Sequence, residues 1–156
     1  MAATESAELA VFKALLAVYT ADSDKFGAGS VSQGIRNFSR MQAPGDNLTG
    51  NYILVEAFPQ VDDTLDNDYV RVAIRMHIYV NKDVAVADDN SAGELDAIMG
   101  EIRRLYHRKI LANTSDWGFN RVFITREIIL PRSPQAEERS DLVHAVVEME
   151  LTAKKL

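Results

Sequence analysis

The sequence predicts an α+β domain in which a mainly antiparallel sheet of four to five strands carries two helices packed on one face, with long projecting loops. Alternating apolar and polar residues in DYVRVAIRMHIYV, residues 68–80, predict a half-buried strand. Apolar residues at helical spacing in ELDAIMGEIRRLYHRK, residues 94–109, predict an amphipathic helix that covers this strand. The predicted order is helix, long loop, two strands, helix and two strands, and 156 residues suit one domain over 1–156.

The composition argues against several classes of function. The formal net charge of −6 disfavours a protein that holds nucleic acid tightly, because phosphate binding relies on lysine and arginine. The absence of cysteine removes thiol catalysis, thiolate metal sites and disulfides, and it fits a reducing compartment. Residues 1–20 carry Glu5 and Glu8 ahead of an apolar run too short to cross a bilayer, so we expect a soluble helix and no membrane partner.

The first helix is expected to begin near Thr4 to Ser6, where a hydroxyl group can cap it and acidic residues suit its positive end. Little of its circumference is polar, so we expect it to be covered on more than one side. Either the sheet and the second helix cover it, or its extra apolar surface meets another subunit. The main stripe comprises Leu9, Phe12, Leu16 and Tyr19.

Residues 21–51 are rich in glycine, serine and aspartate and are expected to form a loop, which is uncommonly long for a compact domain. Within it, SVSQGIRNFSRM has apolar residues spaced among polar ones. This segment is interpreted either as a short edge strand or as a clamp that orders on contact with a neighbour.

A hairpin is expected next. NYILVEAF, residues 51–58, predicts a strand that Pro59 ends because proline lacks a backbone donor, and a short turn-rich link joins it to the 68–80 strand. In that second strand the core side includes Ile74 and Ile78, because successive side chains alternate between faces. The other side carries Arg71, Ala73, Arg75, His77 and Tyr79.

The second helix is expected to begin at Ser91, which has the spacing of a capping box with Glu94. Its stripe should place Ile98 and Ile102 on the core side of the sheet. Five basic or imidazole side chains crowd its end, where the helix dipole favours cations and where a basic patch is also conceivable. They are Arg103, Arg104, His107, Arg108 and Lys109.

Two closing strands are predicted, GFNRVFITREIIL over residues 118–130 and LVHAVVEMELTA over residues 142–153. The polar connection between them, residues 131–141, is longer than a tight hairpin needs and is expected to project. Trp117 and Phe119 are interpreted as a lid on the core, with a recognition surface as the alternative.

No motif selects a catalytic or metal site. The glycines of residues 29–34 fit neither a nucleophile elbow nor a dinucleotide or phosphate loop. The acidic residues within 62–68 are interpreted as a solvated turn, because a calcium loop would need glycine and glutamate at positions that hold neither. His77, His107 and His144 are far apart in sequence, so a zinc site would require folding to unite them. We therefore expect no catalytic residue, cofactor or metal.

The polar side of the 68–80 strand is the positive signal. Arginine and tyrosine are favoured at protein interfaces, and Arg71, Arg75, His77 and Tyr79 share this side. We expect a subunit that docks with copies of itself, and an ordinary solvated sheet face is the alternative.

The order of the predicted elements matches a known pattern. It consists of the helix ELAVFKALLAVY, the glycine-rich loop, the strands NYILVEAF and RVAIRMHIYV, the helix IMGEIRRLYHRKI and the closing strands. In order, size and pattern they resemble the tail terminator (tail-completion) proteins of long-tailed bacteriophages. The loops over residues 21–51 and 131–141 are longer than the compact pattern of that family.

The resemblance implies a structural virion protein without enzymatic activity. Such proteins form a ring, commonly a homohexamer, that caps the tail tube, ends tube polymerisation and joins the tail to the head connector or neck protein. The implied partners are further copies, tail tube protein and the connector, with DNA only in transient passage through the lumen. The implied location is the neck end of the virion tail, after assembly in the host cytoplasm. We expect the subunit or tube interface to include Arg71, Arg75, His77, Tyr79, Phe38, Arg40, Arg132, Glu137 and Arg139.

Two other functions stay open. The chain could be another phage neck or tail-tube-like ring protein, in which case a tube protein would polymerise alone. It could instead be a small ligand-binding or catalytic α+β domain that uses the sheet face around Arg75 and His77, which a deep concave pocket would favour.

Overall fold

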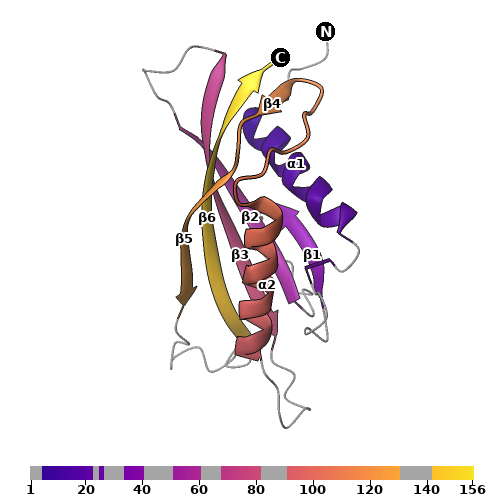
Figure 1. Ribbon diagram of the computed structural model, residues 1–156, viewed down its shortest axis with the longest axis vertical. Coiled ribbons are helices and arrows are strands. Elements are labelled where there is room, and N and C mark those ends of the chain that lie inside the picture. The colour runs from indigo at the N-terminus through magenta and orange to yellow at the C-terminus, as the bar shows by residue number, and fades with distance from the viewer. Residues whose placement is uncertain are drawn as a thin grey trace.

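The computed structural model describes residues 5–22, 25–26, 34–40, 51–60, 68–81, 91–130 and 142–156. Within them, two helices lie on one face of a curled six-stranded sheet, which confirms the predicted α+β class (Figure 1). The helices are α1 (Ala7–Ala21) and α2 (Ser91–Tyr106). The strands are β1 (Ile35–Arg40), β2 (Asn51–Gln60), β3 (Tyr69–Asn81), β4 (Trp117–Phe119), β5 (Phe123–Leu130) and β6 (Leu142–Lys155).

The sheet is mixed and larger than predicted. Its order is β1-β2-β3-β6-β4, with β5 also paired to β6. The hairpin of β2 and β3 is antiparallel as expected, but β1 runs parallel to β2. Four to five strands become six partly because the predicted 118–130 strand is two strands. Val122 is fully buried and exchanges backbone hydrogen bonds with residues 108 and 109, so the chain leaves β6 between β4 and β5.

Strand β1 confirms the edge-strand interpretation of the long predicted loop. Ile35 and Phe38 are buried, and the Tyr19 hydroxyl donates a 2.6 Å hydrogen bond to the Ile35 carbonyl. Phe38 also stacks on Tyr19 and Phe12 of α1, with ring centroids 5.1 and 6.1 Å apart. Aromatic side chains of α1 and β1 therefore hold the edge strand against the helix. Whether the segment contacts a neighbouring chain stays a prediction.

The core lies between the helices and the apolar side of the sheet. Ile74, Ile78, Ile98 and Ile102 are all buried, as the two periodicities predicted. Each such side chain contributes about 1.5–3 kcal/mol when fully buried. The Tyr106 hydroxyl donates a 2.8 Å hydrogen bond to the Leu15 carbonyl and so joins the two helices.

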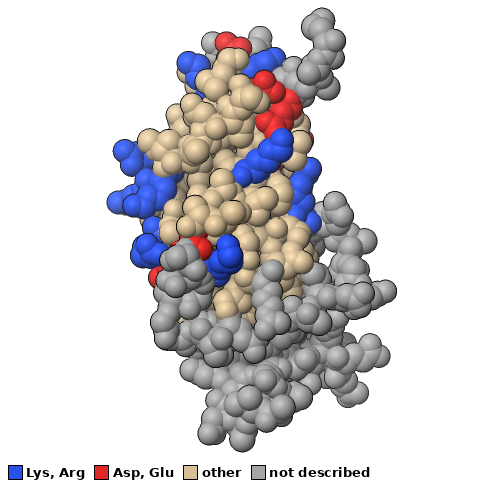
Figure 2. Space-filling model, turned by 90° about the vertical axis from the view of Figure 1, so that its right-hand side faces the viewer, with Lys and Arg blue, Asp and Glu red and all other residues tan. Residues whose placement is uncertain are grey.

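Helix α1 begins where its sequence predicts. Ser6 is the N-cap, and its Oγ accepts a 3.3 Å hydrogen bond from the Leu9 amide. Trp117 and Phe119 are buried, which confirms the core-lid interpretation, and the Trp117 indole donates to the Glu5 carbonyl at 2.8 Å. Figure 2 views the side of the molecule on which α1 lies in Figure 1, and most of the described surface there is uncharged.

Helix α2 begins at Ser91 as predicted but ends at Tyr106, three residues earlier than expected. The chain turns at Arg108, whose φ of 61° is left-handed and incompatible with a continuing helix. The side chains of the predicted capping box, the acidic run over 62–67 and the connection over 131–141 lie outside the described residues. In the described part of the chain, neither helix has the length and apolar character that a membrane span needs.

Candidate docking face of the sheet

No described helix packs on the second face of the sheet, here called the open face. The strand registers arrange its side chains in rows that run across β2, β3 and β6. One row contains Tyr52, Tyr79 and His144, and another contains Glu56, Arg75 and Glu148. The predicted division of β3 into a core side and a polar side is therefore confirmed, because Val72, Ile74, Met76, Ile78 and Val80 are buried on the helix side.

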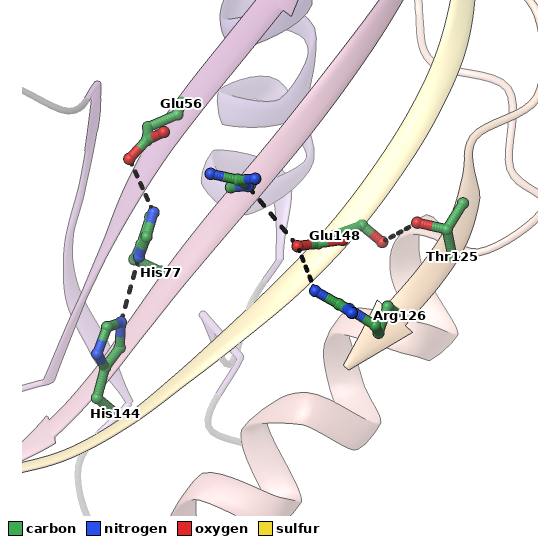
Figure 3. Close-up of polar contacts among 7 residues, drawn as sticks. Glu56, His77, Thr125, Arg126, His144 and Glu148 are labelled. Carbon is green, nitrogen blue, oxygen red and sulfur yellow. Dashed lines mark hydrogen bonds and ion pairs between the residues drawn. The ribbon is translucent and has the colours of Figure 1, made fainter. Parts of the chain in front are cut away.

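The open face contains a hydrogen-bonded chain of Glu56, His77 and His144 (Figure 3). His77 Nε2 lies 2.9 Å from Glu56 Oε1, and His77 Nδ1 lies 3.2 Å from His144 Nε2. An ionised carboxylate only accepts, so neutral His77 carries its proton on Nε2 and accepts at Nδ1 from His144. With this assignment, His144 carries its proton on Nε2, and its Nδ1 is unprotonated.

This chain unites two of the three histidines that are far apart in sequence. Folding brings His77 and His144 together from strands 67 positions apart, whereas His107 lies elsewhere and accepts from the Ile124 amide at 3.0 Å. His77 occupies the polar side of its strand, as predicted, and His144 occupies the same face on β6. Within the described ranges, however, no group of three or more histidine, aspartate or glutamate side chains is arranged to hold a metal ion.

Stacked aromatic rings connect His144 of the hydrogen-bonded chain to two tyrosines. Tyr79 lies between Tyr52 and His144, with ring centroids 4.7 and 4.2 Å away and near-parallel planes. Burial lowers the pKa of His144 from 6.5 to about 4, and the neighbouring His77 adds to the effect. Burial, together with Tyr52 and Glu56, raises the pKa of the Tyr79 hydroxyl. At neutral pH, His144 is therefore uncharged and a weak base.

A second polar cluster centres on Glu148 (Figure 3). Its Oε1 lies 3.3 Å from Arg126 Nη2 and 3.7 Å from Arg75 Nε, while Thr125 Oγ1 donates to its backbone carbonyl at 3.2 Å. Both guanidinium groups are more than half exposed, so these ion pairs add little to stability. Their effect is to orient two arginine side chains on the open face.

Beside this cluster is a depression of about 460 Å³, here called the sheet groove. It forms because Ala73 is short while its register neighbour Phe58 is large and projects, 43% exposed. The Arg75 guanidinium lies 5.8 Å from the centre of the Phe58 ring. The groove is lined by Phe58, Gln60, Ala73, Ile74, Arg75, Thr125, Glu148, Met149 and Glu150.

The structure places only some of the predicted interface residues at the surface. Arg71, Arg75, His77 and Tyr79 share the open face, and Arg40 is exposed at the end of β1. Phe38 is only 7% exposed, so its side chain belongs to the core and is not available at the surface of the single chain. The remaining three, Arg132, Glu137 and Arg139, lie outside the described residues.

Several residues of the open face were not singled out from sequence. They are Glu56, Phe58, Phe123, Arg126, Glu148 and Glu150. Strand alternation marks all of these except Arg126 as outward, and a register shift between Ile124 and Arg126 brings Arg126 opposite Glu148. Only the pairing order shows that the six share the rows of Arg75 and Ala73. Compared with models of known protein families and with curated proteins, the chain matches none of either.

Proposed function

We propose that this protein is a structural subunit of a long-tailed phage virion. Six copies form a ring that caps the tail tube, ends tube polymerisation and joins the tail to the head connector. The observation that carries the proposal is the open face, where Phe58 is 43% exposed beside Arg75 and Phe123, 45% exposed, pairs with Glu150 on β6. Exposed aromatic and arginine side chains grouped on one surface favour a docking role.

The proposed mechanism is geometric. A subunit that uses two different surfaces to contact its two neighbours forms a closed ring when the rotation between copies divides a full turn. One face of the ring then matches the last layer of tail tube protein. The opposite face offers the connector a site and offers tube protein none, so the tube stops growing.

The charge of the chain is consistent with this role. DNA passes through such a ring only transiently, and a lumen that bound phosphate would slow its exit. With a net charge of −6, the protein lacks the excess of lysine and arginine that retains nucleic acid. The protein acts in this proposal without a cofactor, at the neck end of the tail.

The test is a tube-growth assay with purified tail tube protein. Added at the start, the protein should shorten the tubes in proportion to its concentration, and electron microscopy should show six-fold rings at tube ends. Tubes of unchanged length with bare ends would refute the proposal. Long tubes formed by the protein alone would instead support the tail-tube-like alternative.

A small catalytic or ligand-binding domain is the second candidate. The observation that favours it is the Glu56–His77–His144 chain, in which a carboxylate orients two imidazoles. The low pKa of His144 makes it a weak base at neutral pH, which counts against proton abstraction there. Titration of the histidine ring resonances against small carboxylates and phosphates tests this candidate, and specific shifts at His144 would support it.

A further inference from the structure

A short ridge follows α2 and ends on an exposed isoleucine. Ile110 is 62% exposed, while its neighbour Leu111 is buried at 3%. We propose that the Ile110 ridge, residues 108–110 with Arg121, docks into the sheet groove of a second copy of this chain. The inference rests on the proposed function in that it takes the partner to be another copy.

The ridge is held in place before any partner arrives. Ile110 forms a β-bridge with Arg121, and the Arg108 amide donates to the Val122 carbonyl at 2.7 Å. The Val122 amide donates back to the Lys109 carbonyl at 2.9 Å. Because the backbone is already ordered, little conformational entropy is lost when Ile110 is buried at an interface.

The ridge is positively charged. Arg108, Lys109 and Arg121 are all exposed around Ile110. In the described part of the chain none of the three forms an ion pair with a carboxylate, whereas Arg103 pairs with Glu127 at 2.5 Å and Arg104 with Glu101 at 2.7 Å. The predicted basic patch at the end of α2 is therefore reduced to the residues that surround Ile110.

The sheet groove is complementary in shape and charge. Ala73 forms its floor and Phe58 one wall, so an aliphatic side chain can contact carbon atoms there. Glu150 lines the groove, is exposed, and makes no hydrogen bond or ion pair with another described residue. An aliphatic side chain flanked by cations therefore meets an apolar floor and the Glu150 carboxylate.

The ridge and the sheet groove are formed by different residues of the subunit. The groove opens on the open face, and the ridge lies in the segment that follows α2. Each copy therefore offers a ridge to one neighbour and a groove to the other, which is the heterologous arrangement that closes into a ring.

Cysteine cross-linking tests the contact without background, because the chain contains no cysteine. The double variant Ile110→Cys with Ala73→Cys should form a ladder of disulfide-linked oligomers under mild oxidation, ending at the closed ring. Disulfides form only between closely approaching Cα atoms, about 4.4–6.8 Å apart. Each single variant should give no ladder. The matched control, Ile129→Cys with Ala73→Cys, uses another isoleucine of similar exposure, 58%, and should also give none.

Charge exchange gives an independent readout. Glu150→Lys alone and Lys109→Glu alone should each weaken self-association about tenfold, measured by sedimentation, and the two changes together should restore most of the loss. Circular dichroism confirms that each variant is folded. Failure of restoration in folded variants would overturn the pairing of these two residues.

The cross-linking is run with and without tail tubes. If rings form but the variant with Ile110→Cys and Ala73→Cys gives no more ladder than the Ile129→Cys control, the inference is wrong. The ring-forming function would then still stand. A protein that stays monomeric, gives no ladder and leaves tubes uncapped overturns both.

Discussion

His77 Nδ1 lies 3.2 Å from His144 Nε2, while the other ring nitrogen of His77 is held by Glu56. With both rings neutral, the two hydrogen bonds fix both tautomers and leave His144 Nδ1 as the nitrogen without a proton. A proton there places a positive charge in a half-buried position between the Tyr79 ring and His77. The cost of that charge makes the open face sensitive to acid.

Acid should destabilise the wild-type chain more than the variant His144→Phe. The pKa of His144 is lowered from 6.5 to about 4, so the unfolded chain takes up a proton before the folded chain does. Stability is therefore lost as pH falls from about 6.5 towards about 4, and this contribution is constant below that range. After discounting for partial exposure, the difference should be on the order of 1–2 kcal/mol. Urea unfolding at several pH values measures it, and parallel profiles for the two proteins would contradict it.

Truncation in the core should be far more costly than truncation on β5. Ile78 is fully buried, so Ile78→Ala should lower the free energy of unfolding by about 2–5 kcal/mol through lost burial and a residual cavity. Ile129→Ala, at a position 58% exposed, is the matched control and should change it by less than about 0.5 kcal/mol. Denaturant unfolding compares the two, and equal losses would show that Ile129 is covered.

Removing one hydroxyl should loosen the contact between the helices. Tyr106 is fully buried and its hydroxyl donates to the Leu15 carbonyl, so Tyr106→Phe should cost about 1 kcal/mol. The control Tyr69→Phe removes a hydroxyl from a partly exposed tyrosine at the start of β3 and should have a smaller effect. Thermal unfolding measures both, and a variant as stable as wild type would mean that water replaces the lost donor.

Charge reversal on the open face should weaken assembly and leave the fold intact. Arg71→Glu with Arg75→Glu changes two side chains outside the core, and Arg75 is 54% exposed, so the loss of stability should stay below about 1 kcal/mol. Assembly onto tail tubes should fall because the docking face changes charge.

The control for this double variant reverses two charges elsewhere, with Lys25→Glu and Lys155→Glu at exposed positions. Negative-stain images of tube ends and sedimentation of the free protein provide the readouts. Unchanged assembly of the Arg71 and Arg75 double variant would remove both residues from the interface.

Local pattern was sufficient for the core. Alternation in residues 68–80 and the helical stripe in residues 94–109 correctly predicted that Ile74, Ile78 and Ile102 are buried, because each pattern depends only on neighbouring residues along one element. The Ser6 cap and the hairpin of β2 and β3 were predictable for the same reason.

Long-range pairing was not predictable. The parallel placement of β1 beside β2 and the break at Val122 depend on backbone hydrogen bonds between segments that no local pattern links. The candidate interface likewise contained Phe38, whose apolar character suited a surface clamp and a core position equally well. Contact with Tyr19 and Phe12 decided in favour of the core.

By itself, the sequence determined which side chains of β3 and α2 face the core, since that follows from the period of each element. Only the tertiary structure decided which outward side chains are neighbours. Because β3 lies between β2 and β6, Glu56, His77 and His144 form one hydrogen-bonded chain, and Ala73 lies beside Phe58 and Glu150 to create the sheet groove. Strand order and register are set by the sum of many weak contacts across the sheet, and no single segment encodes them.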